Sequence, residues 1–326
     1  MIRFAREGPS ENLWVVVLAG GEGRRLSSLT RALYGREVPK QFAVLGGNRS
    51  LLQRTLERTL PLVPAARTLV VVGEPYAAIA RSHVAPNGPV EIVLQPRNLD
   101  TGPGMLLPLA RILARDPEAC VAFVPSDHHV SRPAALRDAI ARAERACEMR
   151  PDRLFLLGAV ADSPERDYGW ILPDGPLGGD GLSDAFGVRG FVEKPEADRA
   201  AAMQREGAFW NTFVTVARAT TLRGLAEEHL PEHAAAFARY ARAFGGPREA
   251  ATLRAVYRTM TPANFSRLVL ERTDRLGVVP LAGTTWCDLG TPERVLRIFG
   301  PSATAQAAMR RRIVPAASFR WAAAGA

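Results

Sequence analysis

Short apolar runs rich in β-branched residues alternate with longer helical patterns along the first half of this chain. The alternation is typical of βαβ units, because each helix carries the chain back to the start of the next parallel strand. It predicts an α/β fold, a Rossmann-like, mostly parallel sheet with helices on both faces. The strands are expected at Trp14–Ala19, Thr68–Val72, Val90–Leu94, Cys120–Val124 and Leu154–Leu157, and the helices, the first capped by Ser50, at Ser50–Leu60, Pro75–His83, Gly104–Arg115 and Ala134–Glu148.

The alternation becomes less regular after about residue 160. Strands predicted at Tyr168–Leu172 and Val188–Val192 flank a turn segment rich in Gly, Pro and Asp, Pro173–Asp184. The remaining elements are expected to be a helix at Glu196–Glu206, a strand at Phe209–Ala217, helical stretches at Ala219–Phe244 and Arg248–Tyr257, and a strand at Gly277–Leu281. The sequence has no internal repeat and no evident linker. We therefore predict a single domain over residues 13–300, followed by an Ala- and Arg-rich tail over residues 301–326.

Composition narrows the class of protein. Hydrophobic residues make up 47% of the 326 residues and charged residues 23%, values typical of a soluble globular protein. The longest early apolar run, Trp14–Gly20, is shorter than the ~20 residues that span a bilayer, and no signal-peptide cleavage site follows it. The three cysteines form no close pair, which favours a reducing compartment. We expect a cytoplasmic protein with no membrane partner.

The chain is basic, with a formal net charge of +9 and a pI near 10.2. Such a balance suits nucleic acid, anionic membranes or phosphate-rich small molecules. The charge rests mainly on scattered arginines, with one tight cluster at Arg310–Arg312. Aromatic residues are not interleaved with them, unlike in proteins that bind single-stranded nucleic acid. We expect an arginine-rich, solvated surface and no nucleic-acid partner.

The first predicted strand runs directly into a glycine-rich segment, Gly20–Leu26 (GGEGRRL). Glycines after a buried strand let backbone N–H groups approach phosphate oxygens. A Rossmann fingerprint would need a third glycine where Leu26 stands, and a Walker loop would need a Gly-Lys-Ser/Thr end. What remains is an ordinary tight turn or a phosphate cradle with its own guanidinium, Arg25. The later segment Pro39–Phe42 (PKQF) adds a second cation, Lys40, to such a cradle.

Leu18–Leu26 followed by Pro39–Phe42 resembles the signature of the sugar-nucleotide pyrophosphorylases, and PKQF resembles the mannose-1-phosphate guanylyltransferase branch. The resemblance covers roughly residues 13–298, because further motifs follow in the family's order. It implies Mg²⁺-dependent nucleotidyl transfer from a nucleoside triphosphate (GTP in this branch) to a sugar 1-phosphate (mannose 1-phosphate), with release of pyrophosphate. Homo-oligomerisation is left open. The nucleotide-binding residues that it implies here are Ala19, Gly20, Gly21, Gly23, Arg25 and Lys40, with Arg25, Lys40 and Asp127 catalytic.

Two carboxylates are candidates to hold the metal. Asp127 lies just beyond the predicted strand Cys120–Val124, and open α/β sheets bind ligands at the carboxyl ends of their strands. Carboxylates suit Mg²⁺ that bridges phosphates, which is the role that the resemblance gives to Asp127; the alternative is a cap on the following turn. Trp286–Thr291 resembles the family's Trp-x-Asp-x-Gly segment. This makes Asp288 the second metal carboxylate, or alternatively an acid at a helix N-terminus.

Three later motifs resemble the sugar side of the family's site: Tyr168–Trp170, Phe191–Pro195 and Trp210-Asn211. The resemblance implies that Gly169 lets the backbone approach the sugar and that Glu193 accepts hydrogen bonds from its hydroxyls. Lys194 would grip the sugar phosphate, and Asn211 would add a polar contact. A Glu-Lys-Pro string by itself is an ordinary exposed strand end, so the order of the motifs carries this interpretation.

Gln95–Pro103 occupies the place of the family's base-recognition loop. The resemblance implies base contacts from Gln95 and Thr101 and a close backbone approach at Gly102. The chain departs from the guanylyltransferase pattern at Leu99, where an Arg is usual. It departs again at Trp210–Phe213, which reads Trp-Asn-Thr-Phe in place of Trp-Asn-Ser-Gly. These departures leave the base and the sugar open.

Other functions remain as alternatives. One is a uridylyl- or thymidylyltransferase that acts on glucose 1-phosphate, and another is a non-catalytic, nucleotide-binding regulatory homologue. A third is a metallopeptidase, because His229–His233 (HLPEH) matches an inverted zincin motif. That chemistry needs both histidines on one helical face, and Pro231 interrupts the turn between them. We therefore predict that one helix ends near His229 and the next begins at Pro231.

Overall fold

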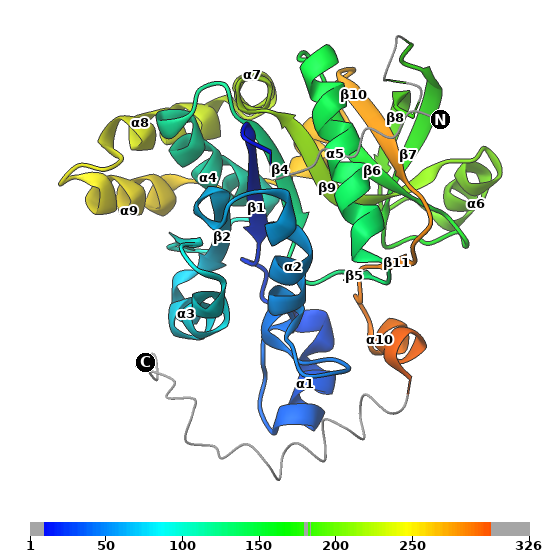
Figure 1. Cartoon of the computed structure of the whole chain (residues 1–326), viewed down its shortest axis with the longest axis horizontal. Coiled ribbons are helices and arrows are strands. Elements are labelled where there is room, and N and C mark those ends of the chain that lie inside the picture. Colours follow the sequence, from blue (N-terminus) through cyan, green and yellow to red (C-terminus); the bar gives the residue numbers. More distant parts are fainter. Residues whose placement is uncertain (1–9, 179–181, 183, 301–326) are drawn as a thin grey trace.

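The structure is a computed structural model that describes residues 10–178, 182 and 184–300. The predicted tail and its arginine cluster lie outside the described residues. A nine-stranded sheet forms the centre, in the order β3-β2-β1-β4-β9-β6-β10-β8-β7 (Figure 1). Its strands are β1 Leu13–Leu18, β2 Thr68–Gly73, β3 Glu91–Gln95, β4 Cys120–Pro125, β6 Leu154–Val160, β7 Gly169–Pro176, β8 Phe186–Glu193, β9 Phe209–Arg218 and β10 Leu276–Leu281.

Every strand of this sheet except β8 and β9 runs in the same direction. Parallel pairs join β3, β2, β1 and β4 in turn, and β6 with β10. Strand β9 is inserted antiparallel between β4 and β6, and β8 runs antiparallel between β10 and β7. The prediction of a mostly parallel α/β sheet is confirmed.

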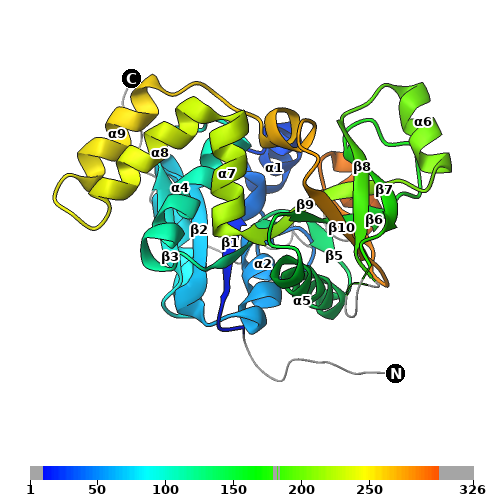
Figure 2. The same ribbon diagram turned by 90° about the horizontal axis from the view of Figure 1, so that it is seen from above.

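Helices cover both faces of the sheet, as expected (Figure 2). Side chains of β1 alternate between two cores because successive residues of a strand point to opposite faces. Val15 and Val17 pack with α2, α3 and α5, whereas Trp14 and Val16 pack with α4, α7, α8 and α9. The helices are α1 Ser27–Tyr34, α2 Leu51–Thr59, α3 Ala77–Val84, α4 Thr101–Arg115, α5 Pro133–Met149, α6 Ala197–Arg205, α7 Ala219–His229, α8 Pro231–Ala243, α9 Glu249–Thr259 and α10 Pro292–Phe299. In the described part of the chain, none of them has the length and apolar character needed to cross a bilayer.

Local sequence explains how two of these helices begin. The predicted cap of α2 is confirmed: Ser50 Oγ accepts a hydrogen bond from Gln53 N, and the Gln53 side chain accepts one from Ser50 N. The expected helical stretch Ala219–Phe244 is two helices, since Pro231 lacks a backbone N–H and takes the first position of α8. The predicted break after His229 is confirmed, and it places His229 and His233 on different helices.

The turn segment predicted at Pro173–Asp184 is wrong at its start. Pro173–Pro176 belong to β7, which pairs antiparallel with β8. The pairing register shifts between Leu172 and Pro173, and such an irregularity accommodates a proline that cannot donate to the ladder.

A second, two-stranded sheet was not predicted. It consists of β5 His129–Val130 and β11 Trp286–Cys287, which pair antiparallel. This ladder joins the segment that precedes α10 to the segment that follows β4. It lies beside Asp127 and Asp288, the acidic residues of the site described below.

Candidate active site

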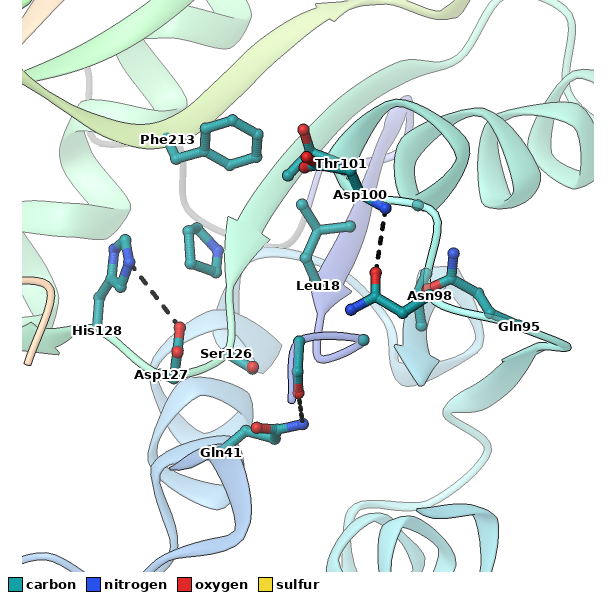
Figure 3. Close-up of a pocket in the computed structure, with 15 residues that line it drawn as sticks. Leu18, Gln41, Gln95, Asn98, Asp100, Thr101, Ser126, Asp127, His128 and Phe213 are labelled. Atoms are coloured by element: carbon teal, nitrogen blue, oxygen red, sulfur yellow. Dashed lines mark hydrogen bonds and ion pairs between the residues drawn. The ribbon is translucent and has the colours of Figure 1, made fainter. Parts of the chain in front are cut away.

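A cavity of about 460 Å³ opens at the carboxyl ends of β1 and β4, where Leu18 and Pro125 lie (Figure 3). Open α/β sheets bind their ligands at this edge. The cavity is lined by the glycine loop at Gly20 and Gly21, by Gln95, Asn98, Asp100, Thr101 and Gly104, and by Ser126, Asp127, His128 and Phe213.

The glycine loop is held by the side chain of Gln41. Its amide Nε2 donates to the carbonyl oxygens of Ala19 and Gly21, at 2.8 Å each. Gly23 has a φ of +64°, and a Cβ there would lie 2.7 Å from the backbone nitrogen of Lys40. Gly23 thus lets the loop pack against Lys40, while Gly20 and Gly21 face the cavity.

Lys40 contacts both candidate metal residues. Its Nζ is 3.0 Å from Asp127 Oδ2, and it also donates to the main-chain carbonyl of Asp288. The lysine side chain is 6% exposed and that of Asp127 is 28% exposed, so the pair is only partly screened by water. Burial raises the pKa of the Asp127 carboxyl, but the nearby Lys40 charge outweighs it, and the pKa lies below its usual range.

Asp288 reaches this region through the ladder of β5 and β11. Cys287 pairs with His129, so Asp288 and His128 come next to each other where the two strands leave the ladder. Burial lowers the pKa of His128 to about 4, which leaves its imidazole neutral beside Asp127 at neutral pH. The ladder thus brings Asp127 and Asp288 into one region although more than 150 positions separate them in the sequence.

The Asp288 carboxylate is almost fully engaged by its neighbours. Its Oδ1 accepts hydrogen bonds from Tyr168 Oη at 3.0 Å, Gly290 N at 2.9 Å and Arg294 Nη1 at 3.0 Å. Its Oδ2 lies 3.2 Å from Arg294 Nη1 and 3.6 Å from Arg25 Nη2. Burial raises the pKa of Asp288, but the charges of Lys40 and Arg294 and the Gly290 N–H keep it below its ordinary value.

Because of these contacts, Asp127 and Asp288 are not equally suited to bind a magnesium ion. Asp127 fits, since its carboxylate lines the cavity and its Oδ1 lies 3.9 Å from the neutral His128. Asp288 fits only through Oδ2, because Oδ1 already accepts three hydrogen bonds. Among the described residues, no group of three or more His, Cys, Asp and Glu side chains is arranged to hold a metal ion. The chain itself would offer a Mg²⁺ here the Asp127 carboxylate and Asp288 Oδ2.

Arg25 does not line the cavity. Its side chain is 59% exposed and points to Asp288 and Asp167, with Nη1 4.0 Å from Asp167 Oδ2. It therefore lies beside the acidic groups Asp167 and Asp288.

Of the residues predicted to contact the base, Gln95 and Thr101 line the cavity and Gly102 does not. Gln95 lines the cavity and donates from Nε2 to Tyr257 Oη at 3.1 Å. Thr101, at the start of α4, also lines it, and its Oγ1 accepts from Phe265 N at 2.8 Å. Gly102 instead donates to the carbonyl of Ala263, and a Cβ there would lie 2.8 Å from that oxygen. Its lack of a side chain serves packing, and the neighbouring Gly104 faces the cavity in its place.

The predicted sugar-side residues are neighbours at the ends of β7, β8 and β9. A Cβ at Gly169 would lie 2.8 Å from Glu193 Oε2 and 3.2 Å from Asn211 Cβ, so Gly169 makes room for these two side chains. Burial raises the pKa of Glu193. Lys194 is half exposed, with Nζ 3.8 Å from Glu193 Oε1. It belongs to an open depression lined also by Glu165, Arg166 and Asp167.

One segment, residues 263–271, contacts both sides of the site. At the base loop, Asn264 Nδ2 donates to the Asp100 carboxylate at 3.3 Å. At the sugar side, Glu271 Oε1 accepts from Glu193 N at 2.7 Å. Between them lies a π-helical turn, Ser266–Leu270, and such turns often mark functional sites.

Two residues of this region, Phe213 and Arg294, were not predicted from the sequence. Positive φ outside glycine occurs, among the described residues, at Asp100, Lys194, Phe213 and Leu289, which all line or adjoin the site. Strained backbone of this kind tends to gather at functional sites. The departure from the family pattern at Phe213 was the only sequence signal for that residue. Arg294 gave none, because its role comes from tertiary contacts.

The sequence is similar to those of known biosynthetic proteins. The xanthan biosynthesis protein XanB of Xanthomonas campestris pv. campestris (strain B100) is 31% identical over 87% of this chain and 58% of its own length. The mannose-1-phosphate guanylyltransferase of Escherichia coli K12 is 32% identical over 64% of this chain and 43% of its own length. The chain thus spans about half the length of the curated relatives that it matches.

Among solved structures, a mannose-1-phosphate geranyltransferase from Thermus thermophilus superposes with a TM-score of 0.75 and 32% identity. The match covers 88% of this chain and 79% of that one. The nucleotidyl transferase family matches residues 14–300, which include the sheet apart from Leu13 and every predicted site residue. This chain belongs to the nucleotidyl transferase family.

Proposed function

We propose that this chain transfers a nucleotidyl group from a nucleoside triphosphate to a sugar 1-phosphate and releases pyrophosphate, with Mg²⁺ as its cofactor. GTP and mannose 1-phosphate are the proposed substrates, and one domain over residues 13–300 carries the activity. The observation that carries the proposal is the convergence of Lys40, Asp127 and Asp288 beside the glycine loop. The name of the Escherichia coli relative supports the choice of substrates.

The chemistry fits these residue types. The phosphate oxygen of a sugar 1-phosphate is ionised near neutral pH, so its attack on the α-phosphorus needs no general base. The obstacle is the approach of one anion to another, and positioning with charge neutralisation lowers such a barrier. Asp127 would hold Mg²⁺, which would supply part of this charge neutralisation.

The chain's own groups supply the rest. Lys194 is proposed to hold the phosphate of the attacking sugar, and Glu193 and Asn211 its hydroxyls. The N–H groups of Gly20 and Gly21, with Lys40 and Arg25, are proposed to stabilise the charge that leaves with pyrophosphate. Lys40 can do so without leaving its place, because a primary ammonium has three donors.

The proposed location is the cytoplasm, which suits three free and buried cysteines. The proposed partners are the two small substrates, and no nucleic acid or membrane is proposed. Leu99 is 4% exposed and packs in the core beside α4, so it offers no polar group to a guanine base. This keeps uridylyl or thymidylyl transfer to glucose 1-phosphate as the second candidate.

A pyrophosphate-release assay with Mg²⁺ tests the proposal. GTP, UTP, dTTP, CTP and ATP are each paired with mannose 1-phosphate and glucose 1-phosphate. Turnover that is highest with GTP and mannose 1-phosphate supports the first candidate, and a preference for UTP or dTTP with glucose 1-phosphate supports the second. Nucleotide binding without pyrophosphate release from any pair would indicate the non-catalytic homologue and contradict both.

A further inference from the structure

Strand β9 carries an irregularity where it passes the cavity. Leu156 pairs with Thr215 and Gly158 pairs with Asn211, so residues 212–214 stand opposite Leu157 alone. Extra residues on one strand form a β-bulge, which bends the strand and redirects its side chains. Bulges of this kind are frequent beside active sites.

Side-chain hydrogen bonds fix this bulge. Thr212 Oγ1 donates to the carbonyl of Leu157 at 2.7 Å and accepts from Val214 N at 3.2 Å. Asn211 Oδ1 accepts from Phe213 N at 3.0 Å. Together they hold Phe213 at a φ of +59°, a left-handed conformation that is unusual for a bulky residue. Such strain persists only where the surrounding contacts determine the backbone.

The bulge delivers the Phe213 ring to the cavity. Phe213 lines the same space as Asp100, Thr101, Asp127 and His128, and Figure 3 shows its ring on the side of Asp100 and Thr101. It is not among the residues that line the open depression at Lys194. The ring therefore faces the base-loop side of the site and not the sugar-phosphate side.

The geometry points to Phe213 as a binding residue for the nucleoside part of the triphosphate substrate, against which the base and ribose pack. The inference rests on the proposed function, because it takes the cavity as the nucleotide site. The same cavity is also lined by the polar side chains of Gln95, Asn98 and Asp100 and by the apolar side chains of Leu18 and Val71. The Phe213 ring adds an aromatic face to this lining, against which a flat base or the C–H edge of a ribose can pack.

Two variants and two kinds of ligand test this assignment. Phe213→Ala removes the ring and keeps a Cβ in the left-handed backbone, whereas Phe213→Gly removes both the ring and the strain. Binding is measured by calorimetry with Mg²⁺ and without sugar phosphate. The ligands are the nucleotides GTP, UTP and dTTP, and inorganic tripolyphosphate, which has the phosphates but no nucleoside.

Both variants should bind the parent protein's preferred nucleoside triphosphate about tenfold more weakly, the scale of one base–aromatic contact. Their affinity for tripolyphosphate should stay within about twofold of the parent value. Phe213→Gly should melt at a higher temperature than Phe213→Ala, because only the alanine variant retains a Cβ at positive φ. Equal losses for the nucleotide and for tripolyphosphate, or a changed melting temperature with unchanged nucleotide affinity, would overturn the assignment.

The outcome is separable from that of the proposed function. A parent protein that turns over its substrates, with variants that bind nucleotide normally, contradicts only the role of Phe213. A parent protein that binds a triphosphate through Phe213 but releases no pyrophosphate contradicts only the transferase proposal. A parent protein that binds no nucleoside triphosphate, CTP and ATP included, contradicts both.

Discussion

The Nζ of Lys40 lies 3.0 Å from Asp127 Oδ2 and also donates to the main-chain carbonyl of Asp288. One buried ammonium thus joins a side chain at the end of β4 to the backbone that follows β11. The cation and the two acids form a single cluster, in which the position of each depends on the others.

Removing the lysine charge should abolish most activity. Lys40→Met is expected to lower kcat by at least ~100-fold, because the leaving pyrophosphate loses a fixed cation in a partly dry site. The variant should remain folded, as judged by circular dichroism and thermal melting. Lys40→Arg keeps the charge and is the matched comparison. A methionine variant with kcat near that of the parent would rule out the proposed role.

Asp127→Asn should lower kcat by at least ~100-fold, because the amide keeps the shape of the side chain but loses the charge that suits a divalent cation. Steady-state kinetics at several Mg²⁺ concentrations measure the loss. Asp162→Asn, in an exposed loop, is the matched control and should leave kcat unchanged. Near-normal turnover by the Asp127 variant at all Mg²⁺ concentrations would contradict the assignment.

Arg294 should matter for stability more than its neighbours on α10. It is 7% exposed and bonds both oxygens of Asp288, and its Nη2 bonds Glu165 Oε2 at 2.6 Å. Arg294→Met removes the charged partner of both Asp288 oxygens, although Tyr168, Gly290 N and Arg25 still contact that carboxylate. The loss is expected to lower the free energy of unfolding by about 1–3 kcal/mol. Arg297→Met, exposed on the same helix, should change it by less than about 0.5 kcal/mol. Urea unfolding compares the two variants, and equal effects would contradict this interpretation of the contacts.

Two glycines with similar backbones should respond differently to alanine. Gly23 and Gly207 have φ values of +64° and +76°. The space around Gly207 is open, whereas a Cβ at Gly23 would lie 2.7 Å from Lys40. Gly207→Ala should lower stability by about 1–2 kcal/mol, the strain of a left-handed alanine. Gly23→Ala should lower it more and should also weaken triphosphate binding, measured by calorimetry. If both variants bind triphosphate like the parent, the loop does not depend on this close packing.

Acid should destabilise the fold through two histidines. Burial lowers the pKa of both His128 and His129 from 6.5 to about 4. Between those values the unfolded chain binds protons that the folded chain excludes, so stability falls as the pH falls from 6.5 toward about 4. Melting temperatures across this range should decrease, and His129→Gln should flatten part of the slope. An unchanged slope in that variant would show that His129 does not contribute.

Most strands of the central sheet could be predicted from the sequence. The side chains that surround Asp288 could not. The strands from β1 to β4 and β6 were predictable because each is a short, largely apolar run. The pair β5 and β11 was not, because two residues carry no periodicity. Pro173–Pro176 were assigned to a turn because proline and glycine usually end strands, whereas here an irregular strand pair holds them. Rules based on neighbouring residues cannot predict that pairing with a distant strand will accommodate these residues.

Some site residues could likewise be predicted from the sequence and others could not. Asp127 and the glycine loop were identifiable from their position after apolar strands, and the structure brings them to one cavity. The true neighbours of Asp288 were not, because Arg294 and Tyr168 reach it from separate elements. Gly102 illustrates the opposite error: the sequence shows that a side chain is excluded there, but not that Ala263 excludes it.

The short ladder of β5 and β11 also joins segments that lie on opposite sides of half the central sheet in the sequence. The two ends of the contact between Lys40 and Asp288 are 248 positions apart, and β10 ends at Leu281, before the later residue emerges. A nascent polypeptide can therefore complete its entire central sheet while the lysine still lacks its second acceptor. The proposed catalytic cluster is therefore completed by a residue that follows the whole central sheet in the chain.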